Sequence, residues 1–326
     1  MPTPEGRKVL NIGLLGAGRI AEVHARHLAS HRELRLAERH GAASSADVAG
    51  VLGDAAIDAV LIASSSSSHA DLITRAVEAG KPVFCEKPLD LDLARANACL
   101  RQIEGKGVPV FVDFNRRFDP HHAALEQAVR TGEAGVVELV SITSRDPEPP
   151  PLAYLAGSPG ALFLETMVHD LDMARWLLGE EPVLVFATAS CLIEPEFRAL
   201  NEVDSAVAVL RTASGRLCQI NNSWRATYGY DQRIEVLGSG GMVRSDNVRR
   251  STVERYDARA VRSDVFQYFF IERYLESYRL ALDHFAAVVR HGTAPLITAE
   301  DGRRALVLAD AALRSARSGQ PVAIHY

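Results

Sequence analysis

The chain has 326 residues, of which 47% are hydrophobic and 24% are charged, so it is long enough for two ordinary domains. Its 41 acidic residues outnumber 36 basic ones, for a formal net charge of −5, and it has no long basic run, which argues against nucleic acid as a partner. No apolar run is long enough to span a bilayer. We therefore expect a globular protein that acts on a small, neutral or polar molecule and not at a membrane.

The four cysteines show no C-x-x-C spacing, and the first residues lack a secretory pattern. Both observations favour a reducing, cytoplasmic location. The spacing of the histidines offers no three-ligand cluster, so we expect no metal.

A glycine-rich turn follows the first apolar run, at residues 9–15, and leads into a helix-like stretch. Strand, glycine turn and helix in this order is the context that a dinucleotide-binding G-x-G-x-x-G/A motif needs, although such a turn also joins strands to helices without any ligand. Gly16 would allow the tight turn, Gly18 would let a pyrophosphate approach the backbone, and Ala21 would let helix and strand pack closely. The N-terminus of the helix would face the phosphates. The expected cofactor contacts in this turn are Gly16, Gly18, Arg19 and Ile20.

Three more strand-like runs, at 59–63, 83–85 and 108–114, each end in polar residues. Strands that alternate with helices predict a parallel, doubly wound α/β sheet, which binds ligands at the carboxyl ends of its strands. The serine run at 64–68 follows one of these ends, and we interpret it as a loop over the cofactor, because a flexible linker there would separate a strand from its helix. The expected contacts in these polar tails are Ser64, His69, Glu86 and Lys87.

The stretch at 29–47 is short for a dinucleotide fold. Such a fold needs a second strand that ends in an acid about 20 residues past the glycines, followed by another helix and strand. Glu38 stands at the right distance, so we favour a strand at 34–37 with Glu38 as the ribose ligand. The alternative is one continuous helix over 20–40, which contains neither Gly nor Pro, and this would leave the adenosine end without an obvious acid.

Residues 160–176 predict a helix with Glu165, His169 and Asp172 on one stripe, because the spacing i, i+4, i+7 repeats roughly every turn. A histidine flanked by two carboxylates can move a proton at neutral pH. The alternative interpretation is a solvated polar face.

Longer alternating runs follow residue 136 and predict an open, mostly antiparallel sheet with the Glu165 helix on one face. Tyr228 and Tyr230 alternate along an expected strand, either at a ligand site or in the core. Two amphipathic helices at 270–291 and 300–318 are expected to cover the first domain. We predict a dinucleotide-binding domain at 1–118 and an α+β domain for substrate binding and oligomerisation at 119–326.

With the glycine turn, Glu86-Lys87-Pro88, the NRRFD run at 115–119 and the 160–176 helix in this order, the chain resembles the Gfo/Idh/MocA family of nicotinamide-dependent sugar and polyol dehydrogenases. Residues 228–232 and 269–278 look like its inositol 2-dehydrogenase branch. The resemblance covers essentially the whole chain. It implies NAD-dependent oxidation of a secondary alcohol of a cyclitol or sugar, myo-inositol to the 2-keto product first of all, by a homo-oligomer, either a dimer or a tetramer.

The catalytic group of that family is the lysine of the EKP tripeptide with the acid and the histidine of the second-domain helix. The resemblance assigns these roles to Lys87, Glu165 and His169, with Asp172 contacting the polyol. As a mechanism, His169 would act as the base, Lys87 would stabilise the developing alkoxide, and Glu165 would orient the imidazole or anchor a second hydroxyl. The other expected substrate contacts are Arg117 and Tyr228.

The sequence departs from the family pattern at three places. Glu165 stands where Asp is usual, which moves the carboxylate by about 1.5 Å, one carbon–carbon bond. Asp113 stands where glycine is usual, which adds a charge near the nicotinamide side. Family members also carry a full strand and helix between the pieces that resemble residues 33–36 and 37–41. These departures favour a competing hypothesis, a non-catalytic relative that binds polyol or nucleotide, while a dehydrogenase for another sugar stays open.

The cofactor expected from the residues is NAD and not NADP. Glu38, at the end of the second strand, would repel a 2′-phosphate. Arg35 and Arg39 keep this preference modest, because each carries a positive charge on the same short stretch.

Overall fold

The computed structural model describes residues 9–41 and 45–326. The chain forms two compact units, Met1–Asn115 with Glu276–Leu306, and Arg116–Leu275 with Val307–Tyr326. The predicted boundary after residue 118 stays a prediction. The chain leaves the first unit at Asn115 and re-enters it through a C-terminal helix.

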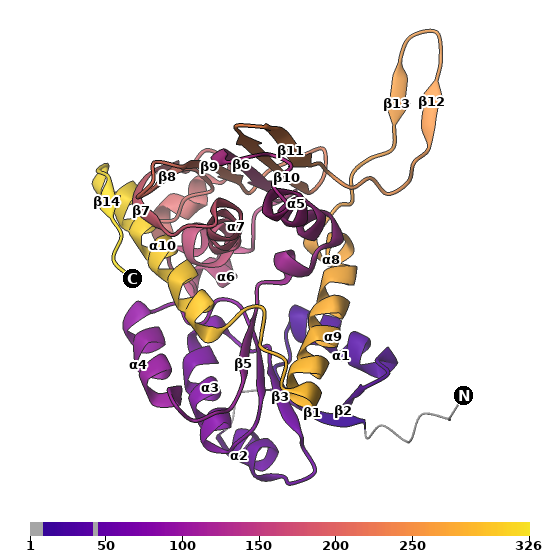
Figure 1. Cartoon of the computed structure of the whole chain (residues 1–326), viewed down its shortest axis with the longest axis vertical. Coiled ribbons are helices and arrows are strands. Elements are labelled where there is room, and N and C mark those ends of the chain that lie inside the picture. The colour runs from indigo at the N-terminus through magenta and orange to yellow at the C-terminus, as the bar shows by residue number, and fades with distance from the viewer. Residues whose placement is uncertain (1–8, 42–44) are drawn as a thin grey trace. The chain divides into compact units, whose positions relative to one another are not determined.

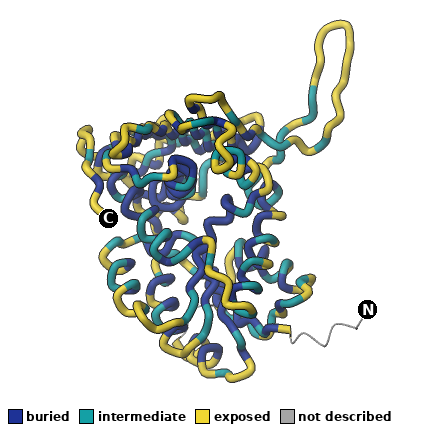
Figure 2. The backbone as a smooth tube through the Cα atoms, viewed as in Figure 1, coloured by how far each residue is buried: buried dark blue, intermediate teal, exposed yellow. Residues whose placement is uncertain are grey.

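The first unit holds a five-stranded parallel sheet in the order β2-β1-β3-β4-β5. Strands β3, β4 and β5 are buried along their whole length and are apolar except for the acids that end β4 and β5, which is typical of a parallel sheet covered by helices, and the buried colour follows them in Figure 2. The predicted doubly wound α/β fold is therefore confirmed. The strands are β1 (Leu10–Leu15), β2 (Leu34–His40), β3 (Ala59–Ile62), β4 (Val83–Glu86) and β5 (Val110–Asp113), and the helices are α1 (Arg19–Ser30), α2 (Ser45–Gly53), α3 (His69–Glu78), α4 (Leu93–Ile103) and α9 (Leu275–His291).

The region between α1 and β3 contains a strand, as favoured, and the alternative of one continuous helix over 20–40 is wrong. The imidazole Nδ1 of His31 accepts the backbone N–H groups of Glu33 and Leu34, both at 3.0 Å, and this turn ends α1. Pairing with β1 then extends β2 beyond residue 37 to His40.

β2 is an edge strand of the sheet. A dinucleotide fold has the strand order 3-2-1-4-5-6, and removal of its third strand leaves the order seen here. One helix and one strand are therefore absent from the described chain, and α2 crosses directly from β2 to β3. Residues 42–44 lie outside the described residues.

The second unit holds a seven-stranded sheet in the order β11-β10-β6-β9-β8-β7-β14, which Figure 1 shows with α7 beneath it. The pairing of β6 with β9 is parallel, and the other strand pairs described for this sheet are antiparallel, so the predicted open, mostly antiparallel sheet is confirmed. Burial alternates along β8, with Ala206, Ala208 and Leu210 on the covered face and Val207 and Val209 exposed. The strands are β6 (Val137–Arg145), β7 (Pro182–Ser190), β8 (Ser205–Thr212), β9 (Leu217–Ser223), β10 (Asp231–Gly238), β11 (Gly241–Ser245) and β14 (Val322–Ala323).

Helices and a hairpin complete the second unit. The hairpin pairs β12 (Glu254–Tyr256) with β13 (Val261–Ser263) and projects from the rest of this unit in Figure 1. The expected strand at Tyr228–Tyr230 is wrong, because these residues form a turn before β10. Within the described ranges, no helix has the length and apolar character needed to cross a membrane. The helices are α5 (Pro120–Arg130), α6 (Leu152–Ala156), the π-helical turn η3 (Leu162–Met167), α7 (Val168–Leu178), α8 (Phe270–Arg273) and α10 (Ala299–Ser318), the last of which belongs in part to each unit.

A buried histidine on α5 makes the stability of the second unit sensitive to acid. Burial lowers the pKa of His122 to about 3 from its usual value near 6.5, against the opposing charge of Asp119. Below about pH 6.5, the unfolded chain therefore binds a proton at His122, whereas the folded chain does not. Stability is present above that pH and is lost on acidification toward pH 3, by up to about 1.4 kcal/mol per pH unit.

Replacement of His122 by Gln should flatten this dependence, because a neutral amide does not take the proton. We expect the free energy of unfolding in urea to fall less between pH 7 and pH 4.5 in His122→Gln than in the wild type. His121→Gln, at the exposed neighbouring position, is the control and should follow the wild type. Equal acid sensitivity of all three proteins would contradict the assignment.

Candidate active site

The glycine turn of the first unit leaves a place for a phosphate group. Gly16 has φ +150°, and a Cβ on it would lie 2.1 Å from the carbonyl oxygen of Ala63, so this position needs glycine for the fold itself. Gly18 is the N-cap of α1, and a Cβ there would meet nothing within 4 Å. Because glycine carries no capping side chain, the first N–H groups of α1 are left for a ligand. The turn therefore fits a dinucleotide pyrophosphate.

The serine run forms a short 3₁₀ turn, η1 (Ser66–Ser68), that leads into α3. Ser64 Oγ lies 2.7 Å from Ser68 Oγ, so the run is an ordered turn. His69 is 1% exposed, with Nδ1 2.7 Å from the carbonyl oxygen of Pro88 and Nε2 3.3 Å from that of Ser64. Burial lowers the pKa of His69, and a neutral imidazole carries a single N–H, which the shorter distance assigns to Nδ1 as the donor to Pro88. His69 thus ties the loop after β3 to the loop after β4.

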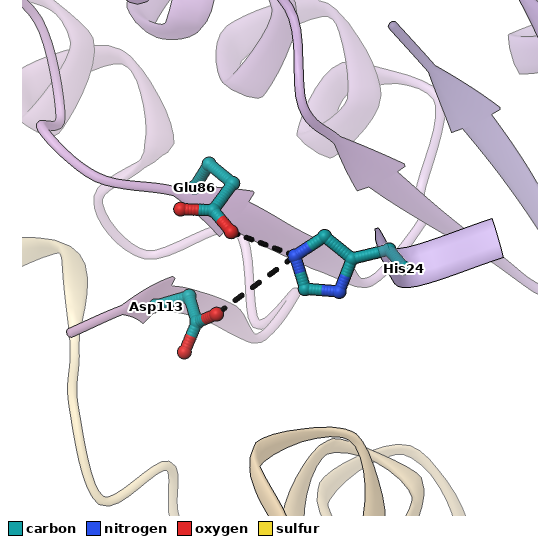
Figure 3. A group of neighbouring side chains, drawn as sticks. All are labelled: His24, Glu86 and Asp113. Atoms are coloured by element: carbon teal, nitrogen blue, oxygen red, sulfur yellow. Dashed lines mark hydrogen bonds and ion pairs between the residues drawn. The ribbon is translucent and has the colours of Figure 1, made fainter. Parts of the chain in front are cut away.

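β4 and β5 end side by side, with Glu86 and Asp113 as partners in register, and Lys87 is the first residue beyond β4. Glu86 Oε1 lies 2.6 Å from Nε2 of His24, which comes from α1 (Figure 3). Burial, together with the charge of Glu86, raises the pKa of Asp113 well above its usual range, although the charge of Lys87 acts the other way. Asp113 was singled out from the sequence, whereas His24 was missed because nothing but the fold brings α1 to these strand ends.

The end of β2 lies next to the glycine turn, because the backbone N–H of Gly16 donates to the carbonyl oxygen of His40 at 2.8 Å. Glu38 stands two residues before this end, and its Oε2 lies 3.3 Å from Nε2 of His40. The guanidinium of Arg39 donates to Glu22 Oε2 at 2.8 Å. The strand therefore ends in a histidine, with Glu38 inside the strand and not at its end.

The predicted helix at 160–176 exists, but its first part is the π-helical turn η3, which leads into α7. In a π-helix the hydrogen bonds run from i to i+5, so Glu165 lies outside the α-helical register of His169 and Asp172, and the predicted single stripe stays a prediction. Glu165 is buried and accepts a hydrogen bond from the hydroxyl of Tyr154, a residue that the sequence analysis missed. His169 is half-buried, whereas Asp172 is fully buried.

His169 is partly exposed on a helix whose other side chains are almost all buried. Between residues 161 and 178, the side chains with partial solvent access are Thr166, His169 and Trp176, and all the others are buried. A half-buried imidazole suits proton transfer, because a substrate reaches it from one side while the protein holds it from the other.

Three buried ion pairs connect the NRRFD run to the helices of the second unit. Arg117 donates to both carboxylate oxygens of Asp172, at 2.8 and 2.6 Å. Arg116 pairs with Asp170, and Asp119 pairs with Arg273.

The predicted substrate contacts Arg117 and Asp172 therefore bind one another in this structure. Asp170 and Arg116 were missed, although two aspartates in an otherwise apolar helix and two adjacent arginines were signals of such pairing. Asn222 adds a hydrogen bond to Asp170 at 2.8 Å, while burial outweighs the arginine and raises the pKa of Asp170.

Tyr228 lies on the surface of the second unit, 47% exposed. Its hydroxyl donates to Asp231 Oδ2 at 2.6 Å and accepts from Arg145 Nη1 at 3.0 Å. With Arg145 and Asn221 it lines an open pocket of about 410 Å³. Tyr230 is buried, so the two tyrosines do not share an environment.

The fold and the glycine turn define a nucleotide-binding oxidoreductase, and comparison with known proteins agrees. The oxidoreductase-family model for the NAD-binding Rossmann fold matches residues 10–114, and the model for the C-terminal alpha/beta domain of the same family matches residues 129–324. The chain belongs to the Gfo/Idh/MocA oxidoreductase family.

Named relatives lie within this family. The inositol 2-dehydrogenase of Rhizobium meliloti is 44% identical over 97% of this chain and 99% of the relative. A crystal structure of a putative myo-inositol dehydrogenase from Sinorhizobium meliloti has a TM-score of 0.92 at 42% identity, covering 97% of this chain and 100% of that one. The scyllo-inositol dehydrogenase of Lactobacillus casei with NAD(H) and scyllo-inositol bound has a TM-score of 0.90 at 25% identity, covering 97% of this chain and 99% of that one.

The two glycines of the turn should respond differently to replacement by alanine. Gly16→Ala places a Cβ against the backbone of Ala63 at an unfavourable φ, so we expect it to lower the free energy of unfolding by about 2–4 kcal/mol. Gly18→Ala meets no atoms, so it should fold within about 1 kcal/mol of the wild type but bind NAD at least about 10-fold more weakly, or 1.4 kcal/mol. Urea unfolding and calorimetric titration check both. Unchanged NAD affinity in Gly18→Ala would remove the pyrophosphate from this turn.

Breaking a buried ion pair should cost much more than breaking an exposed one. Asp172→Asn leaves the Arg117 guanidinium buried without its carboxylate, and we expect a loss of about 3–5 kcal/mol. Asp310→Asn breaks the exposed pair with Arg314 and should cost less than about 0.5 kcal/mol. The free energy of unfolding in urea measures both, and similar small losses would show that Asp172 does not hold α7.

Proposed function

We propose that the chain is an NAD-dependent dehydrogenase that oxidises a secondary alcohol of a cyclitol, with myo-inositol to its 2-keto product as the first candidate reaction. The observation that carries the proposal is the half-buried His169 in an otherwise buried helix. Lys87 at the carboxyl end of β4, where doubly wound sheets bind ligands, supports it. The names of relatives at 42–44% identity indicate the substrate class.

The proposed chemistry is general base catalysis with electrostatic stabilisation. His169 removes the proton of the hydroxyl group, and the ammonium of Lys87 stabilises the oxygen as negative charge develops on it. Glu165, held by the Tyr154 hydroxyl, orients the imidazole or anchors a second hydroxyl. When bound, NAD supplies the acceptor for the hydride.

The residues that we propose to hold NAD lie at the carboxyl ends of the first sheet. The backbone at Gly16 and Gly18 and the first turn of α1 take the pyrophosphate. The remaining proposed contacts are Arg19, Ile20, Glu38, Ser64, His69, Glu86 and Lys87.

A preference for NAD over NADP follows from the charges near the end of β2. Glu38 stands there as a carboxylate that repels a 2′-phosphate. Arg39, the cation best placed to attract that phosphate, is paired with Glu22 at 2.8 Å, which weakens its pull. Calorimetric titration with each cofactor tests this preference, and tighter binding of NADP would contradict it.

His169→Ala should abolish turnover while it leaves the cofactor in place. We expect kcat with myo-inositol and NAD to fall by about 10²–10⁴-fold, because the general base is gone. The dissociation constant of NAD, measured by titration calorimetry, should stay within about twofold. A parallel loss of NAD affinity would count against the role of His169 as base.

A non-catalytic relative is the second candidate, favoured by the absent helix and strand after β2 and by the buried Glu165. A protein of this kind would bind NAD or polyol saturably and would turn over no member of an inositol and sugar panel. Turnover of a sugar in preference to inositol would instead mark a different dehydrogenase of the same family.

We propose further that the chain forms a homo-oligomer, a dimer or a tetramer, through the open face of the seven-stranded sheet. Exposed apolar side chains gather on its strands, among them Phe186 on β7, Val207 and Val209 on β8, and Leu217 on β9. Their exposed fractions of 41–47% are high for apolar groups on neighbouring strands. The mass from sedimentation equilibrium tests the assembly, and a monomer would contradict it.

The four free cysteines agree with a reducing, cytoplasmic location.

A further inference from the structure

A compact group of three ligand-type side chains lies in the first unit, each from a different element. His24 comes from α1, Glu86 from the end of β4 and Asp113 from the end of β5. One ligand atom from each lies within 4.8 Å of the other two, with His24 Nε2 2.6 Å from Glu86 Oε1 and 3.9 Å from Asp113 Oδ2. Figure 3 shows both carboxylates turned toward the same ring nitrogen.

Asp113 is the carboxylate of this group that the fold leaves without a hydrogen bond, and Nδ1 of His24 also has none among the described residues. Asp113 is fully buried, and neither of its carboxylate oxygens has a hydrogen-bond donor among the described residues. A buried carboxylate without a hydrogen-bond donor is strongly unfavourable, so either a bound cation or a proton is needed at this point. The pairing of β4 with β5 fixes Asp113 beside Glu86, so the side chain cannot turn to solvent without breaking the strand register.

The group is also short of positive charge. Two carboxylates face one imidazole. The positive charge of Lys87, the residue after Glu86, also acts on Asp113. A cation with two charges would neutralise the pair of carboxylates.

We propose that His24, Glu86 and Asp113 bind one divalent transition-metal ion of the zinc class. Imidazole nitrogen and carboxylate oxygen are ligands that Zn²⁺ accepts at about 2.0–2.2 Å, and three protein ligands leave a fourth position for water. Shifts of about 1 Å, judged against those bond lengths, would bring the three atoms to one centre. The inference does not rest on the proposed dehydrogenase activity.

Neighbouring aromatic rings orient the imidazole for this task. The His24 ring lies edge-on to Phe84 at 5.2 Å and to Tyr278 at 5.5 Å between centroids. These contacts hold Nε2 toward the carboxylates, while Nδ1 on the other side of the ring has no hydrogen-bond partner among the described residues.

The test uses the full-length protein, freed of metal by chelator and titrated with ZnCl₂ in a calorimeter. We expect one Zn²⁺ per chain and a rise in melting temperature with Zn²⁺ concentration. Co²⁺ should give the visible absorption of a nitrogen and oxygen site, a readout that is independent of activity. Asp113→Asn, which keeps the shape of the side chain, should bind Zn²⁺ at least about 100-fold more weakly, since even indirect partners are worth about 10–100-fold.

Two further variants locate the bound metal within the first unit. Asp113→Gly removes the carboxylate entirely and should lose binding as Asp113→Asn does. Glu22→Gln removes a partly exposed carboxylate from the same helix as His24 and should bind like the wild type. No stoichiometric Zn²⁺ in the wild type would overturn the proposal and leave a proton shared by Glu86 and Asp113 in its place. Equal Zn²⁺ binding by the wild type and both Asp113 variants would overturn it in favour of a site elsewhere.

Discussion

The arrangement of the second unit depends on buried charge. Arg116 and Arg117 leave β5 in consecutive positions and take Asp170 and Asp172 of α7 as partners. A buried ion pair adds little net stability over an apolar core, but a buried charge without its partner costs several kcal/mol. These pairs therefore act chiefly by fixing the position of α7, because a rotation or translation of this helix would leave a buried charge without its partner. The position of His169, next to Asp170 and about one turn before Asp172, follows from that constraint.

Polar side chains have a similar task in the first unit, where they connect the loops that follow the strands. His69 joins the loops after β3 and β4, and His24 joins α1 to the end of β4. Loops at the carboxyl ends of a parallel sheet carry the ligand contacts, yet they have few apolar groups to hold them. Buried histidines replace apolar packing at these places, and each bonds to a backbone carbonyl or a carboxylate.

The features that the sequence predicted well are those that depend on local pattern. The glycine turn, the parallel strands and β2 all follow from residue spacing within about 20 positions. The features that it missed depend on contacts between distant residues or on a local exception to helical geometry. Arg117 and Asp172 are 55 positions apart, so their pairing is visible only in the fold. The π-helical turn was missed because α-helical periodicity cannot anticipate it. The NRRFD run resembles a set of ligand contacts as long as its partners are unknown.

The edge position of β2 bears on how the first sheet avoids adding strands from other molecules. An edge strand offers unpaired backbone groups to which another molecule can add a strand, and this is a route to aggregation. β2 carries Arg35 and Arg39 as exposed cations on this edge. Charged side chains on an edge strand resist such pairing, so the residues that now border the shortened sheet protect it. Without the outer strand, every inner strand pairing of the sheet stays in place. The solubility of the protein then depends on the side chains at the new edge of the sheet.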